Sequence, residues 1–257
     1  MDKYKFQALF DMTGRTVIVT GGTRGIGRAL AEGYVSAGAR VVIASRKAEA
    51  CKETAEHLRS MGGQAIGIPA HTGQLEDLAE IVRRTVDEFG GIDVVVNNAA
   101  TALANTVGEY SPEAWQKSLD VNLRGPIFLT QEALPHLKAS PHAAVLNVLS
   151  GAAFMYSSGV SMYAVGKAGL LAHTRSAAAE YAQYGIRVNG LAPGTTDTDM
   201  VRANTEEAQQ AMADIMLLKR MADPDEIVGP ALLLTSDAGS FITGQVLIVD
   251  GGMVVAR

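Results

Sequence analysis

A short β-branched run, Thr16–Thr20, leads directly into the glycine-rich turn at residues 21–27, Gly-Gly-Thr-Arg-Gly-Ile-Gly, and then into a helical pattern that ends at Gly38. Glycines let a backbone turn tightly and come close to a phosphate group. The first turn of the following helix adds free N–H groups and the positive end of the helix dipole. The segment therefore predicts a dinucleotide-binding α/β fold. The alternative is an ordinary tight turn.

Strand and helix patterns alternate along the rest of the chain, and such alternation builds a parallel sheet with helices on both faces. The length of 257 residues and the 47% of hydrophobic residues suit one Rossmann-type, doubly wound α/β domain, with ligands at the carboxyl ends of its strands. We expect an N-terminal extension at residues 1–13 and a single domain at residues 14–257. The further strands are predicted at residues 40–44, 65–68, 92–96, 143–149, 186–191 and 245–249, and the further helices at 47–61, 75–89, 112–137 and 161–184.

Tyr163 and Lys167 lie four residues apart, thirteen residues after Ser150. On a helix such a pair shares one face at about 5–6 Å. A unit charge at that distance is worth roughly 3 kcal/mol at an effective dielectric constant of about 20, so we expect Lys167 to lower the pKa of Tyr163. The phenol would then serve as a general acid or base. A Tyr-x-x-x-Lys pair also arises by chance, so this interpretation depends on its context.

The sequence that surrounds this pair resembles the short-chain dehydrogenase/reductase family over nearly the whole chain. The family signature Thr-Gly-x-x-x-Gly-x-Gly is matched from Thr20 to Gly27. Six motifs occur in the family's order. They are this signature, Asn97-Asn98-Ala99-Ala100 where the family usually has Asn-Asn-Ala-Gly, Asn122, the Ser150, Tyr163 and Lys167 set, Pro193-Gly194, and Asp250-Gly251-Gly252.

The resemblance implies a catalytic role for four residues. Tyr163 would give the proton, Ser150 would bond the carbonyl oxygen, and Lys167 would hold the nicotinamide ribose. Asn122 would keep a water that links Lys167 to solvent. Two structural alternatives stay open, because Ser150 also suits a helix cap at a strand end and Asn122 a hydrogen bond within a helix.

The end of the second predicted strand bears on cofactor choice. NAD enzymes of doubly wound folds place an acidic residue there to bond the ribose 2′-hydroxyl, whereas this chain reads Ala-Ser-Arg-Lys at residues 44–47. Ser45 and Arg46 suit a 2′-phosphate, and Arg24 is placed to help. We therefore expect NADP(H) to be preferred, with NAD(H) possible. The alternative is that Arg46 and Lys47 only solvate the start of a helix.

One departure from the family lies after the third predicted strand. His71 stands where the family often has an Asp against the adenine, so backbone contacts around Thr72 would replace that bond, or His71 is a simple surface histidine. No metal site is predicted. The residues expected to bind the cofactor are Gly21, Thr23, Arg24, Gly25, Ile26, Gly27, Ser45, Arg46, His71, Thr72, Asn98, Ala99, Ala100, Tyr163, Lys167, Pro193, Gly194, Thr196 and Thr198.

By family position, residues 154–156 form a substrate wall and residues 195–221 a substrate lid. Their Met-rich content suits an apolar or adaptable substrate. The resemblance implies an NADP(H)-dependent oxidoreductase that interconverts a secondary alcohol and a ketone or aldehyde, closest to 3-oxoacyl-thioester and carbonyl reductases. A sugar or a steroid-like ketone is an equal alternative as substrate. Ala100 would add one methyl group beside the nicotinamide. The alternatives are a redox-sensing regulator that binds the dinucleotide without turnover, and an epimerase or dehydratase, which would want a larger substrate domain.

Charge and cysteine content limit the classes of partner and the cellular location that we expect. The net charge of −5, without a long Lys/Arg block, argues against nucleic acid and anionic membranes, which leaves small molecules. A single cysteine, Cys51, excludes an intrachain disulfide and favours a reducing, cytoplasmic location. No apolar run reaches the roughly 18 residues of a membrane span. The resemblance also implies a homotetramer, packed through the predicted helices at residues 112–137 and 161–184.

Overall fold

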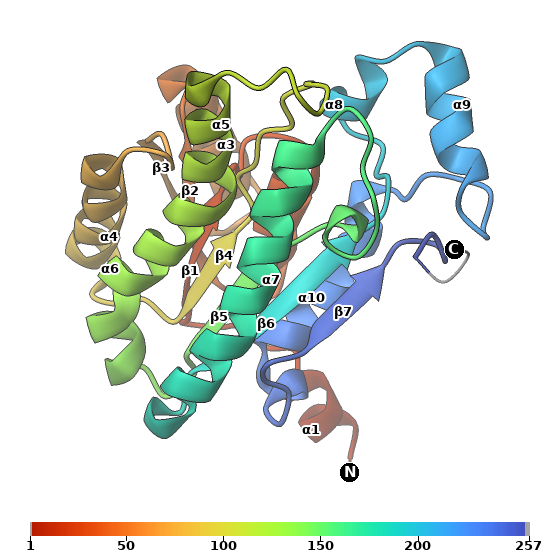
Figure 1. The fold of residues 1–257 in the computed structure, drawn as a ribbon. Helices are drawn as coiled ribbons and strands as arrows, with labels where there is room; N and C mark the ends of the chain where they lie inside the picture. The colour runs from red at the N-terminus through yellow and green to blue at the C-terminus, as the bar shows by residue number, and fades with distance from the viewer. Residues whose placement is uncertain (1, 255–257) are drawn as a thin grey trace.

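Seven parallel strands form one sheet in the order β3-β2-β1-β4-β5-β6-β7 in the computed structural model, which describes residues 2–254 (Figure 1). The chain begins at the centre, runs outward to β3 and returns beside β1 as β4. This reversal creates a crevice at the carboxyl ends of β1 and β4, where ligands of such sheets bind. The strands are β1 Thr16–Thr20, β2 Arg40–Ser45, β3 Gln64–Pro69, β4 Val94–Asn97, β5 Ala144–Val148, β6 Arg187–Pro193 and β7 Val246–Val249.

Helices cover both faces of the sheet, as the alternating pattern predicted (Figure 1). Successive residues of β1 serve opposite faces, because Val17 and Val19 pack into one buried cluster and Ile18 into the other. One face carries α2 Gly25–Ser36, α3 Ala48–Ser60 and α10 Val228–Thr235, and the other carries α4 Leu75–Phe89, α6 Gly125–Ala139 and α7 Ser161–Tyr181.

The helix predicted at residues 112–137 is interrupted. The structure has α5 Pro112–Leu119 and α6 joined by a π-helical turn, η1 Asp120–Arg124. Pro126 has no N–H to donate to the carbonyl of Asn122, so regular α-helical bonding cannot continue there. Gly125 also packs against the chain after β3, since a Cβ at this position would lie 2.2 Å from the carbonyl oxygen of Thr72. The turn therefore widens the helix where Asn122 lies.

The remaining α-helices lie outside the predicted periodic segments. The expected N-terminal extension contains α1 Lys3–Ala8, and the expected lid contains α8 Asp199–Arg202 and α9 Glu206–Asp214, which stand beyond the carboxyl ends of the strands (Figure 1). The prediction missed α10, whose sequence VGPALLLT is apolar on all sides and lacks helical periodicity. Residue 1 of the expected extension and residues 255–257 of the expected domain lie outside the described residues. Across residues 2–254, no helix combines the length and the apolar character that crossing a membrane requires.

Candidate active site

The turn between β1 and α2 has the shape that a phosphate needs. Gly21 and Gly25 adopt φ values of +66° and +51°, in the left-handed region that side chains disfavour. A Cβ on Gly27 would lie 2.2 Å from the carbonyl oxygen of Gly21, so the close approach requires glycine there. Arg24, which precedes the helix, gives it no side-chain cap, and the first-turn N–H groups stay available to an anion. These residues fit the pyrophosphate of a dinucleotide.

Asn98 and Thr20 join the ends of β4 and β1 beside this turn. The side-chain amide of Asn98 donates to the Thr20 carbonyl at 2.8 Å. In return, the Thr20 hydroxyl accepts from the backbone N–H groups of Asn98 and Ala99, both at 3.0 Å. The crevice where the strand order reverses is therefore braced by hydrogen bonds.

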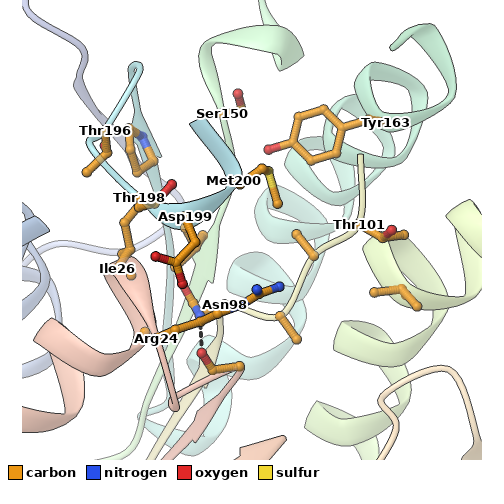
Figure 2. Close-up of a pocket in the computed structure, with 18 of the residues that line it drawn as sticks. Arg24, Ile26, Asn98, Thr101, Ser150, Tyr163, Thr196, Thr198, Asp199 and Met200 are labelled. Atoms are coloured by element: carbon orange, nitrogen blue, oxygen red, sulfur yellow. Dashed lines mark hydrogen bonds between the residues drawn. The ribbon is translucent and has the colours of Figure 1, made fainter. Parts of the chain in front are cut away.

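A cleft of about 390 Å³ runs along the carboxyl edge of the sheet. All of the residues expected to bind the cofactor line it, together with Ser150, whereas Asn122 lies outside its lining. Figure 2 shows Ser150 and Tyr163 near one another on one side of the cleft, with Arg24, Ile26 and Asn98 on another. One cleft thus holds the predicted proton donor and the glycine turn.

Tyr163 lies on the first turn of α7 and is largely enclosed. Burial raises the pKa of its phenol, and a hydrogen bond with Ser150 only partly offsets this effect. The expected net lowering of the Tyr163 pKa is therefore wrong for this structure, because desolvation of the phenolate outweighs the hydrogen bond with Ser150. The phenol is protonated at neutral pH, which is the state of a proton donor.

Ser150 makes the helix cap that the sequence left open as an alternative, and it also lines the cleft. Its hydroxyl accepts from the Ala152 N–H at 3.2 Å and so caps the short 3-10 helix Gly151–Ala153. The same hydroxyl contacts the phenol of Tyr163 at the cleft. The cap fixes the position of the Ser150 hydroxyl in the cleft.

Lys167 is almost fully buried, with 1% of its surface exposed. Its ammonium donates to the carbonyl oxygen of Val148 at 2.6 Å and lies 5.6 Å from the centre of the Tyr163 ring. Burial lowers the pKa of Lys167 to about 8. The Lys167 ammonium therefore loses its proton near pH 8, whereas a surface lysine keeps its charge at that pH.

Asn122 lies in the π-helical turn and is fully buried. It exchanges two hydrogen bonds with the backbone of Thr101, which lines the cleft. Its Cβ also lies 2.8 Å from where a Cβ on Gly166 would stand, beside Lys167 in α7. Asn122 thus links the wall of the cleft to the helix that carries Tyr163 and Lys167.

At the end of β2, the Thr23 hydroxyl donates to the Ser45 hydroxyl at 3.1 Å. The side chains of Arg24 and Arg46 are exposed, and neither has a hydrogen-bond or ion-pair partner among residues 2–254. Both line the cleft beside Ser45. Two guanidinium groups and a hydroxyl suit a phosphate monoester.

The segment expected to form the lid packs against the glycine turn. The methyl group of Thr198 lies 2.9 Å from where a Cβ on Gly25 would stand. The expected wall at residues 154–156 does not line the cleft, whereas Met253 does. Met253 packs on Gly151, 102 residues away in sequence, and no local pattern indicates this contact. Lining residues outside both the predicted cofactor set and the predicted lid include Thr101, Lys117, Val121 and Met253, and lining residues within the lid segment include Asp199, Met200, Val201 and Met212.

Comparisons with known proteins agree with this geometry. Residues 21–254 match the sequence family described as Enoyl-(Acyl carrier protein) reductase. The chain is 34% identical over 244 residues to Dehydrogenase/reductase SDR family member 4 of Homo sapiens, covering 94% of this chain and 88% of that protein. It is 35% identical over 243 residues to the 3-oxoacyl-[acyl-carrier-protein] reductase FabG of Aquifex aeolicus, covering 94% and 98%. A gluconate 5-dehydrogenase from Burkholderia cenocepacia, solved in complex with NADP and tartrate, aligns with a TM-score of 0.93 at 30% identity, covering 98% of this chain and 100% of that one. The chain therefore belongs to the short-chain dehydrogenase/reductase family.

Proposed function

We propose that this protein is an NADP(H)-dependent oxidoreductase that interconverts a secondary alcohol and a ketone or aldehyde, with Tyr163 as general acid and base. The observation that carries this proposal is the position of Ser150, Tyr163 and Lys167 in the same cleft as the glycine turn. A regulator that only binds the dinucleotide has no need of this set. Membership of the oxidoreductase family supports the same choice.

The residues have separable roles in carbonyl reduction. A nicotinamide held in this cleft would supply the hydride that adds to the carbonyl carbon. Negative charge then develops on the carbonyl oxygen, where the hydroxyls of Ser150 and Tyr163 donate hydrogen bonds. Tyr163 transfers its proton to that oxygen, and the Lys167 ammonium stabilises the resulting phenolate. In alcohol oxidation the proton moves in the opposite direction.

The preference for NADP(H) rests on the end of β2. Ser45 offers a hydroxyl where an NAD enzyme has an acidic acceptor, and Arg24 and Arg46 supply two positive charges. The gluconate 5-dehydrogenase solved with NADP shares the fold, which supports a dinucleotide in this cleft. We assign the 2′-phosphate of the cofactor to these three side chains.

The substrate side of the cleft is apolar and adaptable. Met200, Met212 and Met253 line it together with Leu149 and Val201. Methionine side chains adjust to ligands of different shape. The Aquifex aeolicus relative is a 3-oxoacyl-[acyl-carrier-protein] reductase, so an acyl chain with a 3-oxo group is the substrate class that we favour.

The assembly we propose is a homotetramer in the cytoplasm. Apolar side chains remain exposed on α5 and α7, where Trp115 is 37% and Val165 45% exposed, and a second copy would cover them. The cytoplasmic location follows the composition, since the lone Cys51 is a free thiol. Sedimentation equilibrium at micromolar concentration tests the assembly, and a monomer throughout that range contradicts it.

A turnover experiment with both cofactors tests the function. The purified protein is mixed with NADPH or NADH and a panel of carbonyl compounds that contains a 3-oxoacyl thioester, an aromatic ketone and a sugar lactone or keto acid. We expect consumption of NADPH with at least one apolar carbonyl compound, and the reverse reaction with the matching alcohol and NADP⁺. Dinucleotide binding without turnover across the whole panel would instead support the regulator.

A further inference from the structure

The helix that carries Tyr163 begins without a side-chain cap. Val160 precedes the first residue of α7, and its side chain has no atom that accepts a hydrogen bond. The first backbone bond of the helix runs from the Ala164 N–H to the Val160 carbonyl at 3.2 Å. Tyr163 therefore lies in the turn whose N–H groups have no partner within the helix, which is the part of a helix that frays most readily.

Lys167 lies one turn further along α7 and is held more firmly. It is almost fully buried, and its ammonium donates to the carbonyl oxygen of Val148 at 2.6 Å. The helix thus fixes the position of Lys167 but leaves that of Tyr163 to whatever supports its first turn. The geometry of the pair depends on that support.

A hydrogen bond from outside the helix holds this first turn. The hydroxyl groups of Tyr110 and Ser161 are bonded to each other, although the two residues are 51 positions apart in the sequence. Ser161 is the first residue of α7, and both side chains are half-buried. Tyr110 belongs to the loop between β4 and α5, so the bond joins the start of α7 to a separate part of the fold.

The end of the loop that carries Tyr110 is itself anchored. The rings of Tyr110 and of Trp115 in α5 lie 6.1 Å apart. Tyr110 directly precedes Ser111, which caps α5 by accepting from the Ala114 N–H at 3.1 Å. Helix α5 in turn packs against α7. The Tyr110 hydroxyl is therefore presented to Ser161 from a fixed position.

The same loop contacts the chain just before α7 at a second point. The N–H of Asn105 donates to the Gly159 carbonyl at 2.8 Å, and Asn105 and Val160 form a parallel β-bridge. At the other end of the loop, Asn122 holds the backbone of Thr101 through two hydrogen bonds. A segment fixed at both ends therefore supports the approach to α7.

We propose that Tyr110 is a positioning residue for Tyr163, an inference that rests on the proposed function. Its bond with Ser161 takes the place of the missing helix cap and holds the Tyr163 phenol beside Ser150. Neither Tyr110 nor Ser161 lines the cleft, so their effect on the reaction passes through Tyr163. A displacement of about 1 Å at a reacting group costs on the order of 100-fold in rate.

Single-turnover kinetics with NADPH and the best carbonyl substrate of the panel test this inference. Tyr110→Phe removes the hydroxyl but keeps the ring against Trp115, and Ser161→Ala removes the partner. We expect each variant to reduce the substrate about 10- to 100-fold more slowly, with Kd for NADPH and the half-saturating substrate concentration within twofold of the wild type. The double variant should be no slower than either single one, because both changes remove the same bond.

Two further variants separate positioning from a merely structural role. Ser161→Thr keeps a hydroxyl at this position, and we expect its rate to lie within threefold of the wild type. In a Tyr163→Phe background, Tyr110→Phe should change the remaining rate less than twofold, because no phenolic proton donor is left to position. All variants are compared at a temperature at which urea denaturation shows each of them to be folded.

Each other outcome overturns the inference. A rate in Tyr110→Phe within twofold of the wild type, even with reduced stability, assigns the bond to the fold alone. A rate in Ser161→Thr as low as that in Ser161→Ala shows that the hydroxyl is not what matters. An equal further loss in the Tyr163→Phe background shows that Tyr110 acts elsewhere. The wild type still turns over in these three cases, so the proposed function stands. If the wild type reduces no carbonyl compound, the proposed function fails, and the inference fails with it.

Discussion

Asn122 holds the backbone of Thr101 from both sides. The N–H of Thr101 donates to Asn122 Oδ1 at 3.0 Å, and Asn122 Nδ2 donates to the carbonyl of Thr101 at 2.7 Å. One side chain therefore satisfies a donor and an acceptor of the loop that lines the cleft after β4. Asn122 makes this pair of bonds from the π-helical turn, which lies where Pro126 interrupts regular α-helical bonding.

Removing this pair of hydrogen bonds should lower the stability of the folded protein. Asn122→Ala leaves both backbone groups of Thr101 without these partners, and we expect a loss of roughly 2–3 kcal/mol in the free energy of unfolding. Urea denaturation measures it. Ser118→Ala is the matched control, because it removes only the 3.3 Å contact to Asn122 Nδ2 and should cost less than about 1 kcal/mol. Equal losses in the two variants contradict the role given to Asn122.

Lys167 should reduce stability at neutral pH. Burial lowers its pKa from 10.5 to about 8, which corresponds to roughly 3 kcal/mol of unfavourable burial while the group is charged. Lys167→Met removes this cost but also the bond to Val148, so we expect the variant to be more stable by about 1–2 kcal/mol at pH 7. Urea denaturation of the wild type and the variant measures the difference.

The pH dependence of this difference follows from linkage. Between about pH 8 and pH 10.5 the folded protein has released the Lys167 proton and the unfolded chain still binds it. The free energy of unfolding of the wild type therefore rises relative to that of the Lys167→Met variant as pH increases through this window. Below this window the difference between the two free energies is constant. A difference in the free energy of unfolding that stays constant up to pH 10.5 contradicts the lowered pKa of the buried Lys167.

The same group should shape the pH profile of catalysis. Lys167 loses its charge as pH rises through about 8, and with it the stabilisation of the Tyr163 phenolate. We expect kcat/KM for carbonyl reduction to fall above that pH. Alcohol oxidation should instead increase toward alkaline pH, because burial raises the pKa of Tyr163 and its phenolate is needed as the base. Parallel profiles in the two directions contradict the assignment.

Arg46 should determine the choice between the two cofactors. A charge-assisted hydrogen bond is worth roughly 1.5–3 kcal/mol, so Arg46→Ala should reduce the preference for NADPH over NADH by about 10- to 150-fold. Steady-state kcat/KM for each cofactor measures this ratio. Lys47→Ala removes the neighbouring charge, which lies outside the cleft lining, and serves as the control. If the ratio of kcat/KM for NADPH to kcat/KM for NADH is equal in the wild type and Arg46→Ala, Arg46 is only a solvated residue before α3 and does not bind the 2′-phosphate.

The sequence predicted the parts of this fold that depend on local pattern. Buried parallel strands read as continuous apolar runs, and a glycine turn reads as such because only glycine allows its geometry. The sheet and the turn were therefore predictable to within one or two residues, and β1 and α4 to the residue. The contact of Met253 with Gly151 depends on the tertiary path of the chain, and no periodicity encodes it.

The electrostatics of Tyr163 could not be predicted from spacing. The i, i+4 relation to Lys167 gives a distance but no degree of burial, and burial decides the direction of the pKa. The ammonium bonds the carbonyl of Val148, a residue of β5, and that contact exists only in the folded chain. His71 illustrates the same limit, because the residue type does not show which nitrogen Gly73 engages.

The proposed mechanism rests on the phenolic oxygen of Tyr163, and Tyr163→Phe removes that atom alone. A single-turnover experiment with NADPH and the best carbonyl substrate of the panel gives the rate of the chemical step directly. We expect Tyr163→Phe to bind NADPH with near wild-type affinity and to reduce the substrate at least about 100-fold more slowly. A chemical step in Tyr163→Phe within a few-fold of the wild-type rate would contradict Tyr163 as the proton donor.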